Sequence, residues 1–329
     1  MGKKIIFIYI LLTLVLFTSF IFSIALGSRD IDFVDIIKSL FSDRLSEDII
    51  IVKSIRLPRA VMSILVGAGL STSGAAFQAI LKNPLADPFT LGLSGGASFG
   101  AAIAFVFGIS ANLLALPFLA FAGSLSAVFI VYIMNSSKSF GTNSILLSGV
   151  IVSYIFSSAV ILLFAISDAN RLQLAFMWLI GNFSSFDERL LAVTTIAISL
   201  GIIVLCFLGN IINVLSLSGD KPKTFGLNIK THMKIIFLIA SLITAVCTAS
   251  CGIIGFVGLM TPHIMRKFVG ANNVYLLPAC AFAGAAFLSF CDTLSRIIFV
   301  PVMLPVGVIT NIVGGAFFAL LLFKGKRND

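Results

Sequence analysis

The chain has 329 residues, of which 59% are hydrophobic and 11% are charged, and its mean hydropathy is +1.14. These values exclude a soluble globular domain and indicate an all-α, polytopic membrane protein, because a bilayer core about 30 Å thick needs roughly 20 apolar residues per helix. The net charge of +9 does not indicate nucleic-acid binding, since the Lys and Arg residues lie at the ends of apolar segments rather than in one basic patch.

Ten apolar segments follow one another along the chain, and short polar breaks separate them. The seventh and eighth form the weakest pair, because Gly252, Gly255, Gly258 and Pro262 interrupt a run that a single helix would also explain. The sequence therefore predicts one transmembrane domain over residues 1–329 with about ten helices. These helices are expected at 5–26, 58–81, 89–109, 112–134, 144–166, 190–212, 235–251, 253–265, 274–297 and 306–323.

The first apolar segment, 5–26, follows two lysines and so resembles a cleavable signal peptide. Its length favours a retained transmembrane helix instead. The polar stretch that comes next, 27–57, places Asp32, Asp35 and Lys38 among apolar residues at helical spacing. This pattern predicts an amphipathic helix on the outer surface of the membrane.

The distribution of basic residues predicts the orientation of the chain. With ten spans, both basic termini and the loops richest in Lys and Arg lie on one side, which the positive-inside rule assigns to the cytoplasm. An odd number of spans would put the two basic termini on opposite faces. We therefore expect an inner-membrane protein with both termini in the cytoplasm, and the longest cytoplasmic loop at 213–234.

The sequence offers no residues for nucleotide binding or catalysis. It has no G-x-x-x-x-G-K-[ST] run, and its five cysteines fall inside predicted spans, so neither a cofactor nor a metal is expected. Asp292 is the one acid well inside a span, and Arg296 lies four residues on, where it can pair with Asp292. We expect a transport protein rather than an enzyme. An ion-coupled secondary carrier is the alternative, although it should contain further intramembrane charges.

Sequence blocks in a fixed order narrow this interpretation. They are R-L-P-R at 56–59, N-P-L-A-D-P at 83–88, G-I-I-G-F-V-G at 252–258 and D-T-L-S-R at 292–296. Together they resemble the FecCD-type permeases of binding-protein-dependent ABC importers for iron siderophores, haem and cobalamin. The resemblance covers about residues 50 to 323, which is most of the chain.

The resemblance implies the type II ABC importer permease fold. Its members work as two permease subunits embedded in membrane lipid. Two cytoplasmic ATPase subunits and an extracytoplasmic substrate-binding protein complete the importer. It implies an iron chelate, either siderophore or haem, as the cargo, with cobalamin as the alternative. The second permease can be another copy of this chain or a homologue.

The resemblance also assigns roles to single residues. The binding protein is expected to dock on Arg56, Arg59 and Arg296. The alternative is that these arginines anchor to lipid headgroups or pair with groups inside the protein. The cytoplasmic gate and translocation pathway are expected at Thr142, Asn143 and Ser148. Contact with the ATPase is expected at Leu217, Gly219, Asp220, Phe225, Gly226 and Leu227.

Three further segments carry structural alternatives. The two prolines of 83–88 predict a stiff reversal, with ATPase contact as its functional alternative. The W-x-x-G segment at 178–181 belongs to the outer mouth of the pathway or anchors at the membrane interface. The glycines at 67, 69, 92, 96 and 100 have spacings that permit helices to approach one another closely in lipid.

Overall fold

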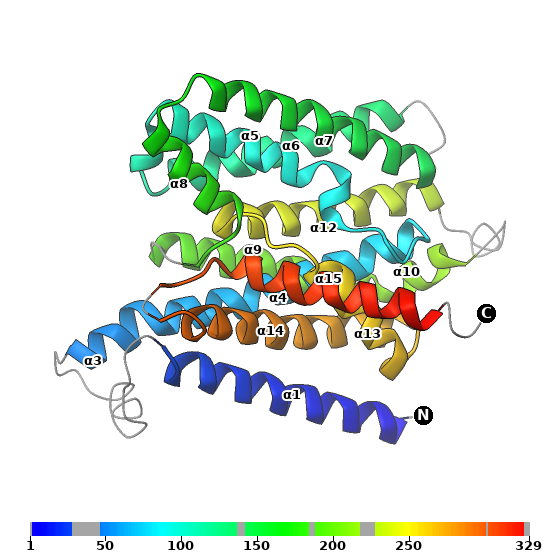
Figure 1. Cartoon of the computed structure of the whole chain (residues 1–329). Helices are drawn as coiled ribbons and strands as arrows, with labels where there is room; N and C mark the ends of the chain where they lie inside the picture. Colours follow the sequence, from blue (N-terminus) through cyan, green and yellow to red (C-terminus); the bar gives the residue numbers. More distant parts are fainter. Residues whose placement is uncertain are drawn as a thin grey trace.

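The structure is a computed structural model that describes residues 2–27, 47–136, 142–183, 188–217, 228–300 and 302–325. Every regular element in these ranges is helical. Figure 1 shows the long helices running side by side in one bundle, with the N-terminus and the C-terminus at the same end. This arrangement agrees with an even number of spans.

Each predicted segment contains one long helix. Their bounds are α1 (Gly2–Ala25), α4 (Leu57–Ile80), α5 (Leu93–Val106), α6 (Ala115–Ser136), α7 (Thr142–Ala165), α9 (Glu188–Phe207), α12 (Ile229–Cys251), α13 (Val257–Val269), α14 (Asn273–Ile297) and α15 (Val306–Gly325). Within the described ranges, seven of these are long and apolar enough by length and composition to cross a membrane. The others are α4, α5 and α13.

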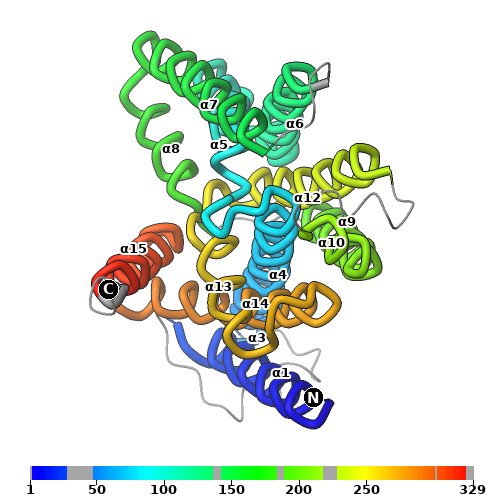
Figure 2. The backbone as a smooth tube through the Cα atoms, turned by 90° about the vertical axis from the view of Figure 1, so that its right-hand side faces the viewer, coloured from blue at the N-terminus to red at the C-terminus, as the bar shows by residue number. Residues whose placement is uncertain are grey.

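The central position of α4 explains its lower hydropathy. In Figure 2, which views the bundle from the end with both termini, α4 lies in the middle. Nearly all its residues from Arg59 to Ile80 are buried, and many are Gly, Ala, Ser or Thr. Small residues let neighbouring backbones approach closely, so a helix surrounded by protein does not need the apolar surface that faces lipid.

Short helices connect these long ones. They are α3 (Glu47–Ile50), the π-helical turn η1 (Ile51–Arg56), the 3-10 turns η2 (Pro88–Leu91) and η3 (Ile109–Ala111), α8 (Ala169–Leu179) and α10 (Gly209–Ser216). The sequence analysis did not predict α8. It also joined α9 and α10 into one helix, which the structure divides at Leu208. Most of the predicted outer amphipathic segment, residues 28–46, lies outside the described residues.

The predicted break between the seventh and eighth segments is confirmed. Gly252 ends α12 with a φ of 77°, and Phe256 begins α13 with a φ of 67°. Pro262 lies inside α13 and removes the N–H that would bond the carbonyl of Gly258. The Gln78 side chain of α4 donates to this carbonyl instead, over 3.3 Å, so the backbone group stays satisfied inside the bundle.

The predicted close approach of helices at small residues is also confirmed. A Cβ added to Gly67 on α4 would collide with the carbonyl of Gly284 on α14, and one added to Gly96 on α5 would collide with the carbonyl of Gly123 on α6. These contacts hold α4 against α14 and α5 against α6. Packing at this distance is a main source of helix association in lipid.

Candidate functional site

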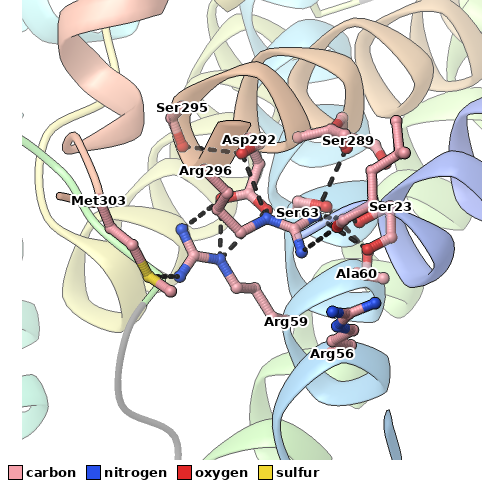
Figure 3. Close-up of polar contacts among 12 residues, drawn as sticks. Ser23, Arg56, Arg59, Ala60, Ser63, Ser289, Asp292, Ser295, Arg296 and Met303 are labelled. Carbon is pink, nitrogen blue, oxygen red and sulfur yellow. Dashed lines mark hydrogen bonds and ion pairs between the residues drawn. The ribbon is translucent and has the colours of Figure 1, made fainter. Parts of the chain in front are cut away.

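Three arginines and one aspartate gather at the end of the bundle away from the termini (Figure 3). Arg56 ends η1 and Arg59 lies in the first turn of α4, while Asp292 and Arg296 lie in the last two turns of α14. The structure thus brings the three predicted docking residues together. Their side chains are buried, with exposed fractions of 4%, 5% and 3%, and Asp292 is fully buried.

Asp292 forms ion pairs with two of these arginines. Arg59 Nη2 lies 2.8 Å from Asp292 Oδ1, and Arg59 Nε lies 3.0 and 3.1 Å from the two carboxylate oxygens. Arg296 Nε lies 3.2 Å from Oδ2, which confirms the pairing expected from its position four residues after Asp292. A planar guanidinium fork that meets both oxygens of a carboxylate gives a strong, oriented contact.

Arg56 and Arg296 also contact the C-terminal end of α1, whereas Arg59 Nη1 lies 3.9 Å from Met303 Sδ. Arg56 Nη1 donates to the carbonyls of Ile24 and Ala25, each over 2.8 Å. Arg296 donates to the Ser23 carbonyl over 2.9 Å and to its hydroxyl over 3.0 Å. The last carbonyls of a helix lack partners within the helix and carry partial negative charge, so cations there are favourable. The cluster therefore ties α1 to α4 and α14.

These contacts correspond to the internal pairing that the sequence left open as an alternative to docking. Arg59 and Arg296 are directed toward Asp292, and Arg56 is directed toward α1. The docking role stays a prediction. Any acidic group arriving from outside would have to compete with Asp292 for these guanidiniums.

The predicted gate residues lie at the start of α7. Thr142 and Asn143 begin this helix, after residues 137–141, which are outside the described part of the chain. Ser148 is buried against α6, where its hydroxyl accepts from Asn135 Nδ2 over 3.0 Å and donates to the Ser144 carbonyl over 2.7 Å. Asn135, which the sequence analysis did not single out, therefore fixes the position of the first turns of α7.

Leu217 is the one predicted ATPase-contact residue within the described ranges, and it directly follows α10. Its carbonyl accepts a hydrogen bond from the Lys82 ammonium, which comes from the turn after α4. Gly219, Asp220, Phe225, Gly226 and Leu227 lie outside the described residues.

The chain reverses at residues 83–88, as its prolines predict, and local hydrogen bonds close this turn. Asn83 Oδ1 accepts from the Leu85 N–H over 2.9 Å, and the Asp87 carbonyl accepts from the Thr90 N–H over 3.1 Å. Burial raises the pKa of the Asp87 carboxyl to about 6, although a hydrogen bond from the Phe89 backbone opposes this shift.

The W-x-x-G segment at 178–181 joins three helices. Gly181, with a φ of 80°, accepts from the Gly307 N–H at the start of α15, and the Asn182 N–H donates to the Cys251 carbonyl over 2.8 Å. A Cβ on Gly252 would collide with the Trp178 carbonyl. Trp178 also lines a cavity of about 530 Å³ between the α5–α6 connection, α8, α9 and α12. Among the residues described, no group of three or more His, Cys, Asp or Glu side chains is placed to hold a metal ion.

The sequence profile of the FecCD transport family matches residues 13–324. The chain belongs to this family. The family predicted from the sequence blocks is thereby confirmed.

Similar proteins agree with this assignment over most of the chain. An ABC transporter permease protein of Bacillus subtilis is 38% identical over 282 residues, which cover 84% of this chain and 80% of that protein. An iron chelatin transport system permease protein of Helicobacter pylori is 37% identical over 289 residues, covering 87% of this chain and 86% of that one. A solved metal-chelate type ABC transporter in an inward-facing conformation has 28% sequence identity and a TM-score of 0.85, covering 97% and 99%.

The FecCD chain is accordingly a multi-pass, all-α membrane protein with the type II ABC importer permease fold. The fold class predicted from the sequence is confirmed, and the number of about ten transmembrane helices is approximate, because seven helices within the described ranges are long and apolar enough to span a membrane.

Proposed function

We propose that this protein is the membrane-spanning permease subunit of an ATP-driven ABC importer for an iron chelate, either a siderophore or haem. The observation that carries the proposal is the likeness of the whole fold to a metal-chelate type ABC transporter, with a TM-score of 0.85. The iron chelatin permease from Helicobacter pylori supports the same class of cargo. Cobalamin is the alternative cargo.

A second permease subunit, either another copy or a homologue, covers the outer face of α15. This helix stands at the edge of the bundle and packs on α13 and α14 (Figure 2). Asn311 lies in its second turn and is exposed in the single subunit, although most residues of the helix are apolar. Polar side chains inside a membrane face protein or a water-filled path rather than lipid, so this face belongs at the subunit interface or the pathway.

ATP hydrolysis is supplied by two separate cytoplasmic ATPase subunits, because the sequence contains no phosphate-binding loop. The end of the bundle that carries both termini faces the cytoplasm, and the segment after Leu217 contacts the ATPase there. Thr142, Asn143 and Ser148 belong to the cytoplasmic end of the pathway. An extracytoplasmic binding protein delivers the cargo to the opposite end, where Arg56, Arg59 and Arg296 lie.

The proposal is tested by transport into proteoliposomes. The purified permease alone should hydrolyse no ATP, and vesicles that also contain the ATPase and binding protein should accumulate a ferric siderophore or haem when ATP is enclosed. Vesicles that lack the ATPase should not. Accumulation by the permease alone under a proton or sodium gradient would contradict the proposal and favour a secondary carrier. Labelled cobalamin, assayed in parallel, separates the two cargo classes.

A further inference from the structure

A polar cavity of about 350 Å³ opens at the end of the bundle that carries both termini. Its walls come from the end of α4 with the turn after it, from α10, from α13 and from the start of α14, elements that pack on one another around α4 (Figure 2). The side chains that define its chemistry are Gln78, Lys82, Asn83, Ser216, Arg266 and Asn273.

The cavity carries two positive charges. Lys82 and Arg266 line it, and among the described residues no acidic side chain does. Gln78 accepts from Arg266 Nη1 over 2.6 Å while its own amide donates to the Gly258 carbonyl, so the guanidinium is oriented by a neutral partner. Lys82 donates to the neutral carbonyl of Leu217. A carboxylate is the group that two cations held by neutral partners accommodate best.

Lys82 occupies a position that usually belongs to glycine. It follows Leu81, the residue that caps the C-terminal end of α4, and has a φ of 50°. The Lys82 N–H donates to the Ala79 carbonyl, and the Asn83 N–H donates to the Gln78 carbonyl. This is the Schellman termination of a helix, in which glycine avoids the steric conflict of a side chain in the left-handed region. Strain retained at one residue points to a function for its side chain.

The cavity also holds an acceptor that needs a donor. Asn273 is 2% exposed, and both its backbone N–H and its Nδ2 donate to Asn213 Oδ1, over 2.7 and 2.9 Å. Asn273 Oδ1 has no hydrogen-bond partner among the described residues. A buried acceptor left unsatisfied is unfavourable, so an incoming N–H or hydroxyl would be stabilised here.

We propose that this cavity is a socket for an acidic side chain of the partner ATPase, bound by Lys82 and Arg266, with a neighbouring N–H or hydroxyl of the same partner bound by Asn273. The proposal rests on the proposed function, because it takes the ATPase as the cytoplasmic partner. The socket lies around the end of the central helix and is bounded by Ser216, one residue before Leu217. An ATPase contact at the cavity would therefore act on α4, α13 and α14 directly, in addition to the loop that follows Leu217.

The test is to purify the whole transporter from its native host by a tag on the permease and to quantify the ATPase subunit that it retains. We expect Lys82→Gly and Arg266→Glu to reduce retained ATPase by about tenfold or more, because each removes a charge that the carboxylate needs. Lys82→Gly should leave thermal stability equal or higher, since glycine suits the left-handed position. Lys267→Glu is the matched control, because Lys267 is exposed beside Arg266 and does not line the cavity.

Each alternative has its own outcome. Equal retention by Lys82→Gly, Arg266→Glu and Lys267→Glu would overturn the socket. Full retention by Lys82→Gly together with loss in Asp220→Asn would place the ATPase contact in the loop after Leu217 alone and would also overturn the socket. If the wild-type permease retains no ATP-binding subunit and ATP drives no uptake, the proposed function itself fails.

Discussion

Arg59 and Asp292 are separated by 233 residues in the sequence, and their side chains form a bidentate ion pair between α4 and α14. The same carboxylate also holds Arg296, with Nε 3.2 Å from Oδ2. Because Asp292 is fully buried, one negative charge compensates two guanidiniums in a region that water does not reach. Removing this carboxylate would leave both arginines buried without their counter-charge.

We therefore expect Asp292→Asn to destabilise the protein by about 3–5 kcal/mol, as breaking a buried ion pair commonly does. The measurement is thermal unfolding in detergent. Asp168→Asn is the control, because Asp168 is exposed and lies 3.7 Å from Arg171, and exposed pairs contribute little. Equal unfolding temperatures for the two variants would contradict a stabilising role for the buried cluster.

Patterns within one segment were sufficient to predict much of this fold. The apolar runs predicted the long helices, because a helix in lipid must satisfy its own backbone and therefore has a minimum apolar length. The glycines around 252 predicted the break between α12 and α13, and the spacing of Asp292 and Arg296 predicted their pairing. All these features depend on neighbours within a few residues.

Side-chain contacts between different helices were not predicted. Arg59 reaches Asp292 only because α4 crosses α14, and Asn135 reaches Ser148 because α6 and α7 are antiparallel neighbours. Asn135 follows an apolar segment directly, and a polar residue at such a position is a signal that could have been used. No sequence pattern indicated that Lys82 lies at the left-handed end of α4, because glycine is the residue expected there.

The crossing of α4 and α14 depends on glycine. A Cβ on Gly67 would collide with the Gly284 carbonyl, and one on Gly284 would collide with the Ser71 side chain. We expect Gly67→Ala to separate the two helices and lower the unfolding temperature by several degrees, in line with about 1–3 kcal/mol for overpacking. Gly2→Ala at the start of α1, where a Cβ meets nothing within 4 Å, is the control. If both variants unfold at the same temperature, close packing at Gly67 is unimportant.

Cysteine labelling checks the orientation of the bundle. Leu85 is exposed in the turn after α4, and Ala111 is exposed in η3 at the opposite end. In a Cys-free background, Ala111→Cys should react with an impermeant thiol reagent in intact cells, and Leu85→Cys should react only after lysis. The reverse pattern would place the termini outside the cell.

Ser148 has two roles to distinguish, the observed contact with Asn135 and the predicted place in the pathway. The contact predicts that Ser148→Ala reduces stability by about 1 kcal/mol, and the proposed place in the pathway predicts lower uptake per folded molecule. Ser153→Ala is the control, because the Ser153 hydroxyl bonds only the carbonyl of Gly149 in its own helix. Unchanged stability with altered uptake would instead assign Ser148 to the pathway.

The arginine cluster leads to a prediction about the external binding protein. Arg59 and Arg296 share the single carboxylate of Asp292, so a second carboxylate arriving from outside would be attracted to this pair. If carboxylates of the binding protein share these guanidiniums with Asp292, association should weaken as salt rises, and Arg59→Gln should weaken it further. Arg171→Gln, a change at an exposed arginine outside the cluster, should leave association unchanged.

The measurement is binding of the purified binding protein to permease in nanodiscs at low and high ionic strength, expressed per folded molecule. Salt-independent binding of the wild type, together with normal binding by Arg59→Gln, would mean that the arginines serve only to hold α1, α4 and α14 together.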